Sequence, residues 1–270
     1  MKYLKSISML LLLLPIQAMA QFAWYGEKGQ AKVNTGMGNG TNTEGIWYSF
    51  TDAVDRGQST ITFSYPRSAD NLPNDAHVKQ HKGVKGKIAL ITSNCMYRLA
   101  GFGFNVAGKK NNSAEPCDAT SWGGLSIGYS SDKTIKIELR LTDLRNSALG
   151  YDYVGYYLPS TDNNEQFVRI PWSNFKQEGW GVGKITGPEA AKELAAICLL
   201  MNGDEGTYNF KITKIGSYYM QESPGVSTGI TSPADAVDND NWYTISGMQL
   251  QQQPTTPGVY IHNGVKMVVK

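Results

Sequence analysis

The chain is poor in the side chains that metal and nucleophilic sites usually need, with only 3 histidines and 3 cysteines among 270 residues. His77 and His81 have the i, i+4 spacing of a helical metal pair, but no glutamate accompanies them and two histidines alone fall short of a zinc site. We therefore interpret this segment as a solvated loop. The sequence has no Walker loop, so it lacks the P-loop signature. Its two Gly-x-Ser-x-Gly matches, Gly124–Gly128 and Gly225–Gly229, lie in a predicted strand and in a polar linker, so neither forms the strand-to-helix elbow of an α/β-hydrolase.

Long apolar runs are scarce. The one at the N-terminus, Met9–Ile16, follows two lysines and precedes Ala18-Met19-Ala20. A basic start, a short apolar stretch and a small-x-small site are typical of a secretory signal peptide. A transmembrane anchor is the alternative, but a bilayer needs about 20 apolar residues. We expect residues 1–20 to be removed, which leaves a mature chain from Gln21 without a transmembrane segment.

An excess of one charge is missing as well. The chain holds 25 basic and 23 acidic residues, and Lys2 and Lys5 leave with the signal, so the mature chain is balanced at 23 of each. Proteins that bind nucleic acid show a basic excess or a basic stripe. We therefore expect no nucleic-acid partner.

What the sequence has in abundance is glycine (29), tyrosine (15) and tryptophan (6). The clearest strand pattern is 134–141, where Ile135, Ile137 and Leu139 alternate with charged residues. Only 188–194 looks helical, with proline in its first turn. Many short strands and almost no helix predict an all-β, jelly-roll-like β-sandwich over residues 21–221. The further predicted strands are 59–65, with Ile61, Phe63 and Tyr65 on one face, and 102–106, 125–129, 151–158, 166–172, 195–201 and 208–217.

The cysteines leave two interpretations open. Cys198 lies in an apolar run and is interpreted as a buried thiol. Cys95 and Cys117 flank a loop-rich stretch, where they either form a disulfide or stay as two free thiols, because spacing alone does not fix pairing.

Residues 222–240 are polar with scattered prolines and glycines, which predicts a linker. The segment 241–270 follows it, with an aromatic-led strand ending at Gly247, then Gly258-Val259-Tyr260-Ile261, an Asn263-Gly264 hairpin turn and a basic, valine-rich end. These elements, in this order, resemble the C-terminal sorting domain of the type IX secretion system of Bacteroidota. The resemblance implies the secretion machinery as a partner and a location that is secreted or on the outer-membrane surface. A β-hairpin that packs on the body is the alternative.

Three segments of the body, Gly101–Asn105, Asp118–Leu125 and Val168–Phe175, resemble the galactose-binding-like jelly-roll carbohydrate-binding modules. This resemblance implies the jelly-roll fold and a polysaccharide as partner. Such modules often carry an acidic residue in the last strand near a structural calcium. The strand 208–214 has none here, so we expect no cofactor and regard that calcium as doubtful.

Glycan binding needs aromatic faces for sugar rings and planar polar groups for hydroxyls. In the predicted strand 151–158, Val154 and Leu158 point to the core and Tyr156 follows them. The other tyrosines then line the opposite face, beside the charged residues of 134–141 if the two strands are neighbours. Trp122 and Trp180 lie in predicted loops that flank a groove, whereas Trp172 follows a core alternation. The candidate ligand-binding residues are Lys136, Glu138, Arg140, Tyr151, Tyr153, Tyr157, Trp122 and Trp180. A tyrosine-rich strand covered by a loop is the alternative.

The sequence therefore favours an exported, non-catalytic protein that recognises a polysaccharide, such as a plant or environmental β-glycan. One alternative is a glycoside hydrolase or lyase, which needs two carboxylates roughly 5–10 Å apart. Glu138, Asp143, Asp152 and Glu165 are available, but their spacing assigns none of them as acid or base. A surface structural or adhesion protein is the other alternative.

Overall fold

The structure is a computed structural model that describes residues 21–93, 95, 97–223, 242–244, 249–250, 252–262 and 265–269. The expected signal peptide and nearly all of the expected linker lie outside these residues. The chain divides into two compact units, with the boundary between Met220 and Gln221. Each unit is described by itself.

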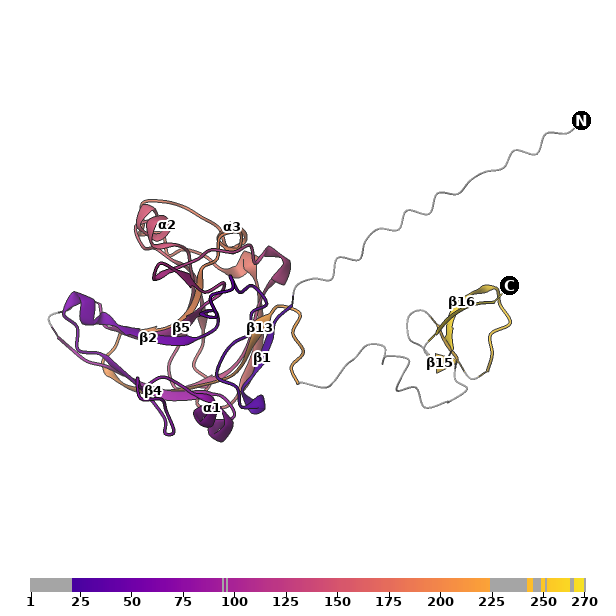
Figure 1. Cartoon of the computed structure of the whole chain (residues 1–270), viewed down its shortest axis with the longest axis horizontal. Coiled ribbons are helices and arrows are strands. Elements are labelled where there is room, and N and C mark those ends of the chain that lie inside the picture. The colour runs from indigo at the N-terminus through magenta and orange to yellow at the C-terminus, as the bar shows by residue number, and fades with distance from the viewer. Residues whose placement is uncertain are drawn as a thin grey trace, which may run out of the picture. The chain divides into compact units, whose positions relative to one another are not determined.

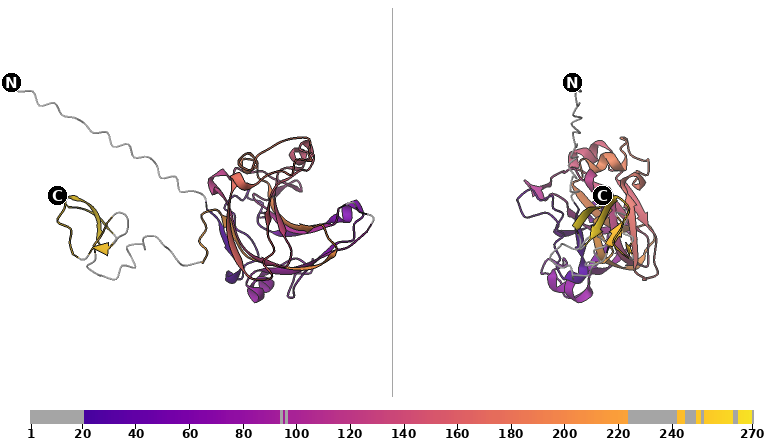
Figure 2. Two further views of the ribbon diagram at one scale, coloured as in Figure 1. Left: turned by 180° about the vertical axis from the view of Figure 1, so that it is seen from behind. Right: turned by 90° about the vertical axis from the view of Figure 1, so that its right-hand side faces the viewer.

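The first unit is a sandwich of two antiparallel sheets that face each other across a core (Figure 1, Figure 2). Sheet A has the order β11-β8-β13-β4-β3, with β1 paired to β13, and sheet B has the order β10-β9-β12-β5-β2. This architecture confirms the predicted all-β sandwich. The strands of sheet A are β1 (Ala23–Tyr25), β3 (Thr60–Phe63), β4 (Val84–Leu90), β8 (Gly124–Ser131), β11 (Gln166–Pro171) and β13 (Gly206–Ser217). Those of sheet B are β2 (Trp47–Thr51), β5 (Leu99–Asn105), β9 (Ile135–Arg140), β10 (Val154–Leu158) and β12 (Ala196–Asn202).

The core is built from the alternate residues of both sheets, as period-two strands require. Phe102 of β5 stacks on Phe210 of β13 with ring centroids 4.6 Å apart, and Phe63 of β3 meets both rings edge-on. Trp47 packs against the same β5 ring and is 2% exposed. Burying such aromatic surface is the main force that holds the two sheets together.

Two aromatic residues at strand ends test the predicted alternation. Tyr65 was expected on the face of Ile61 and Phe63, but it is 80% exposed because β3 ends at Phe63. Trp172 was expected in the core, and at 5% exposed it lies there, packed against Phe175. It begins a 3-10 turn, η4 (Trp172–Asn174), directly after β11.

A short helix stands where the sequence analysis expected a solvated loop. Helix α1 (Asp75–His81) is capped by Asn74, whose side chain accepts from the N–H of His77. The His77 ring is fully buried; Nδ1 lies 2.6 Å from the Ser64 carbonyl and Nε2 accepts from the N–H of Lys85 at 3.1 Å. These partners assign the Nδ1–H tautomer. The loop prediction was wrong because a helix of seven residues shows no apolar period.

Two further helices lie at one end of the sandwich (Figure 1). Helix α3 (Gly187–Ala191) confirms the predicted helix, with a capping box between Thr186 and Glu189. Helix α2 (Asp143–Ala148) follows β9 and was not predicted. The remaining short elements are β6 (Lys109–Lys110), β7 (Ser113–Ala114), η1 (Gly26–Lys28), η2 (Asp52–Asp55) and η3 (Thr120–Trp122).

The three cysteines are free thiols. Cys117 makes an isolated antiparallel bridge with Leu194, and its thiol is half-buried against the core. Cys95 lies in the loop before β5, where its Sγ contacts the carbonyl of Tyr97. The disulfide interpretation is therefore corrected, while the buried thiol predicted for Cys198 is confirmed at 0% exposed.

The second unit is a four-stranded antiparallel sheet of order β15-β14-β16-β17. Its strands are β14 (Trp242–Thr244), β15 (Gln249–Leu250), β16 (Gly258–His262) and β17 (Val265–Val269). The predicted hairpin is present as the β16–β17 pair, and the Asn-Gly turn itself lies outside the described residues. Trp242 stacks on His262 at 4.4 Å. Among the described residues no helix is long and apolar enough to cross a membrane.

Candidate functional site

The face of sheet B that points away from the core carries half of the predicted site residues, and we call it the sheet B outer face. The alternation of side chains along β10 shows which residues lie on this face. Val154 and Leu158 point inward, so Tyr157 points outward. Strand β10 pairs directly with β9, which places Tyr157 opposite Lys136. The side chains and glycines of this face are Tyr48, Phe50, Gly101, Gly103, Lys136, Glu138, Arg140, Gly155, Tyr157, Cys198 and Leu200.

The middle of this face is low because the two central β5 residues on it are Gly101 and Gly103. A Cβ on Gly101 would lie 2.7 Å from the Phe50 ring, and one on Gly103 would lie 2.9 Å from the Cys198 thiol. Larger residues would push these neighbours away. The glycines therefore let Phe50 of the edge strand lean over the sheet, and Tyr48 reaches Cys198 Sγ at 3.1 Å.

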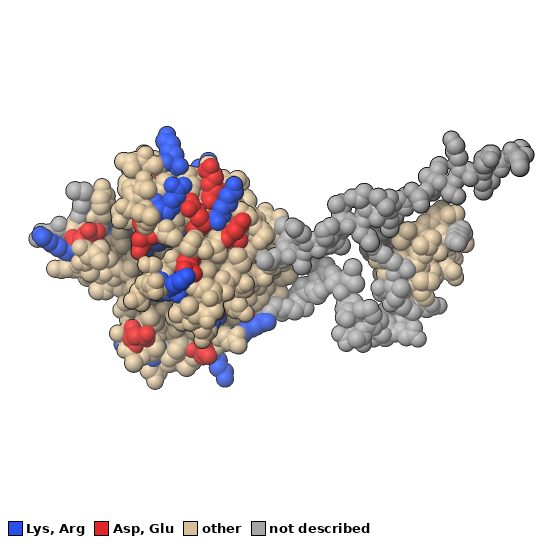
Figure 3. All heavy atoms as spheres, turned by 45° about the horizontal axis from the view of Figure 1, so that its top comes forward, with Lys and Arg blue, Asp and Glu red and all other residues tan. Residues whose placement is uncertain are grey.

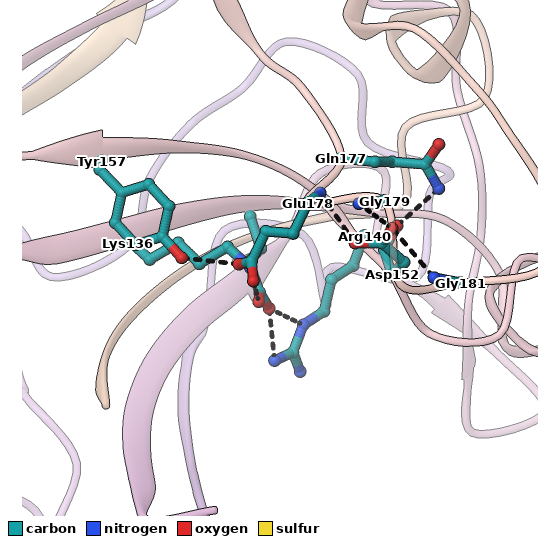
Figure 4. A network of polar contacts seen from close by, with 9 residues as sticks. Lys136, Arg140, Asp152, Tyr157, Gln177, Glu178, Gly179 and Gly181 are labelled. Carbon is teal, nitrogen blue, oxygen red and sulfur yellow. Dashed lines mark hydrogen bonds and ion pairs between the residues drawn. The ribbon is translucent and has the colours of Figure 1, made fainter. Parts of the chain in front are cut away.

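Beside this low floor runs a row of alternating charges, which we call the charge ladder: Arg140, Glu138, Lys136 and Glu178. Figure 4 labels Arg140, Lys136 and Glu178 of this row. The Arg140 guanidinium donates to Glu138 at 2.9 Å, and Lys136 lies 3.3 Å from Glu138 and 2.6 Å from Glu178. The Tyr157 hydroxyl donates to Glu178 at 2.6 Å and ends the ladder. Each charge thus has an opposite charge in contact.

Burial and these contacts shift the pKa of three groups, Lys136, Glu178 and Tyr157. Burial alone would lower the pKa of Lys136 and raise that of Glu178, but their mutual contact and the contacts to Glu138 and Tyr157 outweigh it. The pKa of Lys136 is therefore raised and that of Glu178 is lowered. Burial, together with the hydrogen bond to Glu178, raises the pKa of Tyr157 to about 12. At neutral pH the ladder is ionised at Lys136 and Glu178, and Tyr157 is a neutral donor.

Arg140 is held between two aromatic rings. Its guanidinium carbon lies 4.1 Å from the centroid of Phe50 and 4.8 Å from that of Tyr153. Cation–π contacts of this kind offset the conformational entropy that a long side chain loses when it is held in one position. The guanidinium keeps donors beyond the two that bind Glu138.

The loop that was predicted to carry Trp180 closes one side of the face, and it also carries Glu178, which the sequence analysis did not single out. The buried carboxylate of Asp152 accepts from the backbone N–H groups of Glu178 at 3.0 Å, Gly179 at 2.8 Å and Gly181 at 3.2 Å (Figure 4). Gly181 passes so close that a Cβ there would lie 2.5 Å from the Cβ of Asp152. This arrangement presents the Glu178 carboxylate to the ladder and leaves Trp180 61% exposed. The glycine-rich run around Trp180 indicates this loop in the sequence, whereas no local pattern singles out Glu178.

The predicted tyrosines occupy different environments. Tyr157 is 46% exposed and Tyr151 51% exposed, while Tyr153 is half-buried against Arg140. Tyr151 lies in the turn after α2 with φ 61°, outside β10, and its ring contacts that of Tyr153 at 6.4 Å. Tyr156 packs inward on Phe175, as the alternation predicted. The structure thus brings Tyr151, Tyr153 and Tyr157 to one side, although not as one straight stripe.

Two expectations are corrected. Trp122 was expected to flank a groove, but it is 0% exposed and packs on Phe22 in the core; the 3-10 turn η3 folds it inward. Lys136 and Glu138 do point away from the core, yet each is only 5% exposed because the Glu178 loop and Arg140 cover them.

The four candidate carboxylates do not converge on one place. Asp152 is used by backbone N–H groups, and Asp143 opens helix α2. Glu165 contacts Thr213 and Lys214 of sheet A, on the other side of the sandwich. Only Glu138, joined by Glu178, belongs to the sheet B outer face. Within the described residues no three His, Cys, Asp or Glu side chains are grouped as a metal site.

On the side of the first unit that carries α2 and α3, acidic and basic side chains lie next to one another instead of forming separate patches (Figure 3). This mixture agrees with the paired charges of the ladder.

No protein family and no curated protein matches the sequence. Among solved structures, a family 11 carbohydrate-binding module from Clostridium thermocellum, in complex with a β-1,3-1,4-mixed-linked tetrasaccharide, is 11% identical, with a TM-score of 0.36 over 66% of this chain and 90% of that one. A family 30 carbohydrate-binding module is 13% identical, with a TM-score of 0.36 over 62% and 78% of the two chains. An exo-β-agarase is 11% identical, with a TM-score of 0.32 over 75% of this chain and 25% of that one.

Proposed function

We propose that the sheet B outer face binds a neutral polysaccharide, and that a plant or environmental β-glycan is its ligand. The observation that carries the proposal is the clamped guanidinium of Arg140, set between two aromatic rings on a sheet face that also exposes Tyr157 and Trp180. Apolar sugar faces stack on aromatic rings, and sugar hydroxyls take planar donors and carboxylate acceptors. The sheet B outer face supplies aromatic rings together with such donors and acceptors.

The charges of the face favour a neutral ligand. Each member of the charge ladder already has an opposite charge in contact. An acidic sugar would have to displace Glu138 or Glu178 from its partner, which is costly for groups that are partly desolvated. A neutral hydroxyl can instead share the ladder's donors and acceptors without separating any pair.

The same geometry favours binding over hydrolysis. A glycoside hydrolase needs one carboxylic acid whose pKa is raised so that it can donate a proton. The pKa of Glu178 is lowered, because the hydrogen bonds from Lys136 and Tyr157 outweigh the effect of burial. Glu138, the other carboxylate of the face, is paired with both Lys136 and Arg140.

We also propose that the protein is exported, with residues 1–20 as a signal peptide and 241–270 as a type IX sorting tail. The proposal rests on the sequence pattern of the first twenty residues and on the motif order of the tail. The antiparallel β16–β17 pair is compatible with it.

Calorimetric titration of the full chain with soluble β-glucan, xylan and mannan oligosaccharides tests the binding proposal. We expect at least one neutral series to bind, and Tyr153→Ala and Tyr157→Ala to weaken that binding about tenfold, because an aromatic contact contributes about 0.5–1.5 kcal/mol beyond its buried area. Arg140→Ala should also weaken binding.

Tyr219→Ala is the matched control, since Tyr219 is 45% exposed against 46% for Tyr157 and lies beyond the end of β13 in sheet A. Equal losses in Tyr157→Ala and Tyr219→Ala would reject the sheet B outer face as the site. Release of shorter products from a bound oligosaccharide would replace the binding proposal with an enzyme.

A further inference from the structure

The other outer face of the sandwich, on sheet A, carries a group of cations that the proposed glycan site does not use. Lys85 and Lys87 alternate with the buried residues of β4, and Lys211 and Lys214 lie on the same face of β13. Arg169 of β11 joins them across β8. We call these five residues the basic face.

Their arrangement is unfavourable for the fold alone. Lys85 and Lys211 are directly opposite one another on paired central strands, and Lys87 lies two residues further along β4 on the same side. Like charges directly across a strand pair destabilise a sheet. A polar, uncharged residue at either position would serve an exposed sheet surface better.

Among the described residues, few acidic side chains offset the repulsion between these cations. Lys214 pairs with Glu165 at 3.3 Å. Lys85, Lys87, Lys211 and Arg169 make no ion pair with any residue that the structure describes. Since the mature chain is balanced in charge, this local excess is a property of one face and not of the whole protein.

An aromatic ring lies among the cations. Phe167 of β11 is half-buried, with the Arg169 guanidinium 4.8 Å and the Lys214 ammonium 5.8 Å from its centroid. A ring bordered by positive charge offers a stacking surface and a charge contact side by side.

We propose that the basic face binds an anionic polysaccharide, a glycan that carries carboxylate or sulfate groups along its chain. The charge is complementary, the cations are spread over several strands as a repeating polyanion requires, and Phe167 provides a place for one sugar ring. A flat sheet face cannot enter a groove of double-stranded nucleic acid, which admits a helix or a two-stranded ribbon. This site is independent of the neutral-glycan site proposed for sheet B and lies on the opposite side of the sandwich.

The test uses the full chain and polygalacturonate as the probe, with dextran of similar size as the uncharged comparison. We expect polygalacturonate to bind at low ionic strength and dextran not to bind at this face. The double variant Lys85→Gln with Lys211→Gln should bind polygalacturonate about tenfold more weakly. It should also reduce the slope of log affinity against log salt by about one for each lysine removed.

The matched control is Lys109→Gln with Lys110→Gln, which removes two exposed lysines from β6 and should leave binding unchanged. The melting temperature of the Lys85/Lys211 variant should stay equal or rise, because a repulsive pair is removed. The proposal is overturned if the wild-type chain does not bind polygalacturonate, if both double variants weaken it equally, or if the melting temperature falls. Tighter binding of a single-stranded oligonucleotide through the same two lysines would assign the face to nucleic acid instead.

Discussion

Asp152 gives the sharpest test of how the sheet B outer face is built. Its carboxylate is 1% exposed and accepts three backbone N–H groups, one on Oδ1 and two on Oδ2. The substitution Asp152→Asn keeps the size of the side chain but replaces one oxygen with a donor. The amide NH₂ then faces a backbone N–H, so at least one of the three bonds cannot form.

The magnitude follows from those bonds. A hydrogen bond to a charged group contributes about 1.5–3 kcal/mol, and one between neutral partners about half as much. Losing the bond from Glu178 and weakening the two from Gly179 and Gly181 costs about 3 kcal/mol of unfolding free energy. For a domain of this size we expect the melting temperature to fall by roughly 6–12 °C.

The binding consequence is separate from the stability consequence. The loop that Asp152 holds carries both Glu178 and Trp180 to the sheet B outer face. With the loop released, we expect glycan affinity to fall about tenfold when it is measured at a temperature where the variant is still folded. Calorimetric titration and thermal melting measure the two effects independently.

Asp162→Asn is the control for this substitution. Asp162 is exposed, has φ 49°, and its side chain makes only a 3.5 Å contact to Ser160, and asparagine tolerates that left-handed conformation. Its melting temperature should not change. A wild-type melting temperature in Asp152→Asn would refute the assigned hydrogen bonds, and a lower one with unchanged glycan affinity would remove the loop from the site.

Three further predictions follow from single features. Burial lowers the pKa of His77, so the neutral ring contributes stability that is fully present above its unfolded pKa of about 6.5 and is lost as pH falls through the lower folded pKa. The melting temperature should therefore fall more steeply between pH 7.5 and 4.5 in the wild type than in His77→Gln, and parallel curves would contradict this prediction. Tyr156→Ala should cost about 2–4 kcal/mol in denaturant unfolding because the ring packs on Phe175 in the core, whereas an unchanged midpoint would show that the ring carries no packing energy. N-terminal sequencing of secreted protein should begin at Gln21 or be blocked by cyclised glutamine, and a start within residues 1–20 would reject the cleavage site.

The strand alternation in the sequence was enough to predict which side of β9 and β10 faces the core. The apolar residues Ile135, Ile137 and Leu139 are buried, and Tyr156 points inward with Val154. Alternation works here because side chains of a strand point to opposite faces with a period of two. It also predicted that charged side chains share the outer side of β9 with the exposed tyrosine of β10.

The alternation of side chains does not show which loops or turns cover a face of a sheet, and the wrong predictions arose for this reason. Lys136 and Glu138 point outward but are buried by a loop some forty residues away in sequence, through the contact between Lys136 and Glu178. Trp122 was misplaced because a 3-10 turn has no period that shows its inward side. The Asp152 contacts join two loops, and such pairings depend on tertiary structure that local patterns do not contain.

The first strand of the body pairs with its last. Ala23 of β1 lies opposite Gly216 of β13, and the N–H of Ser217 donates to the carbonyl of Phe22 at 3.0 Å. The chain therefore enters and leaves the sandwich at one point, so new ends opened in an exposed loop and a short link across the old ones should preserve the fold, as circular permutation requires. The same closeness would let the whole sandwich be placed as a cassette within a surface loop of another protein, with both of its outer faces left free.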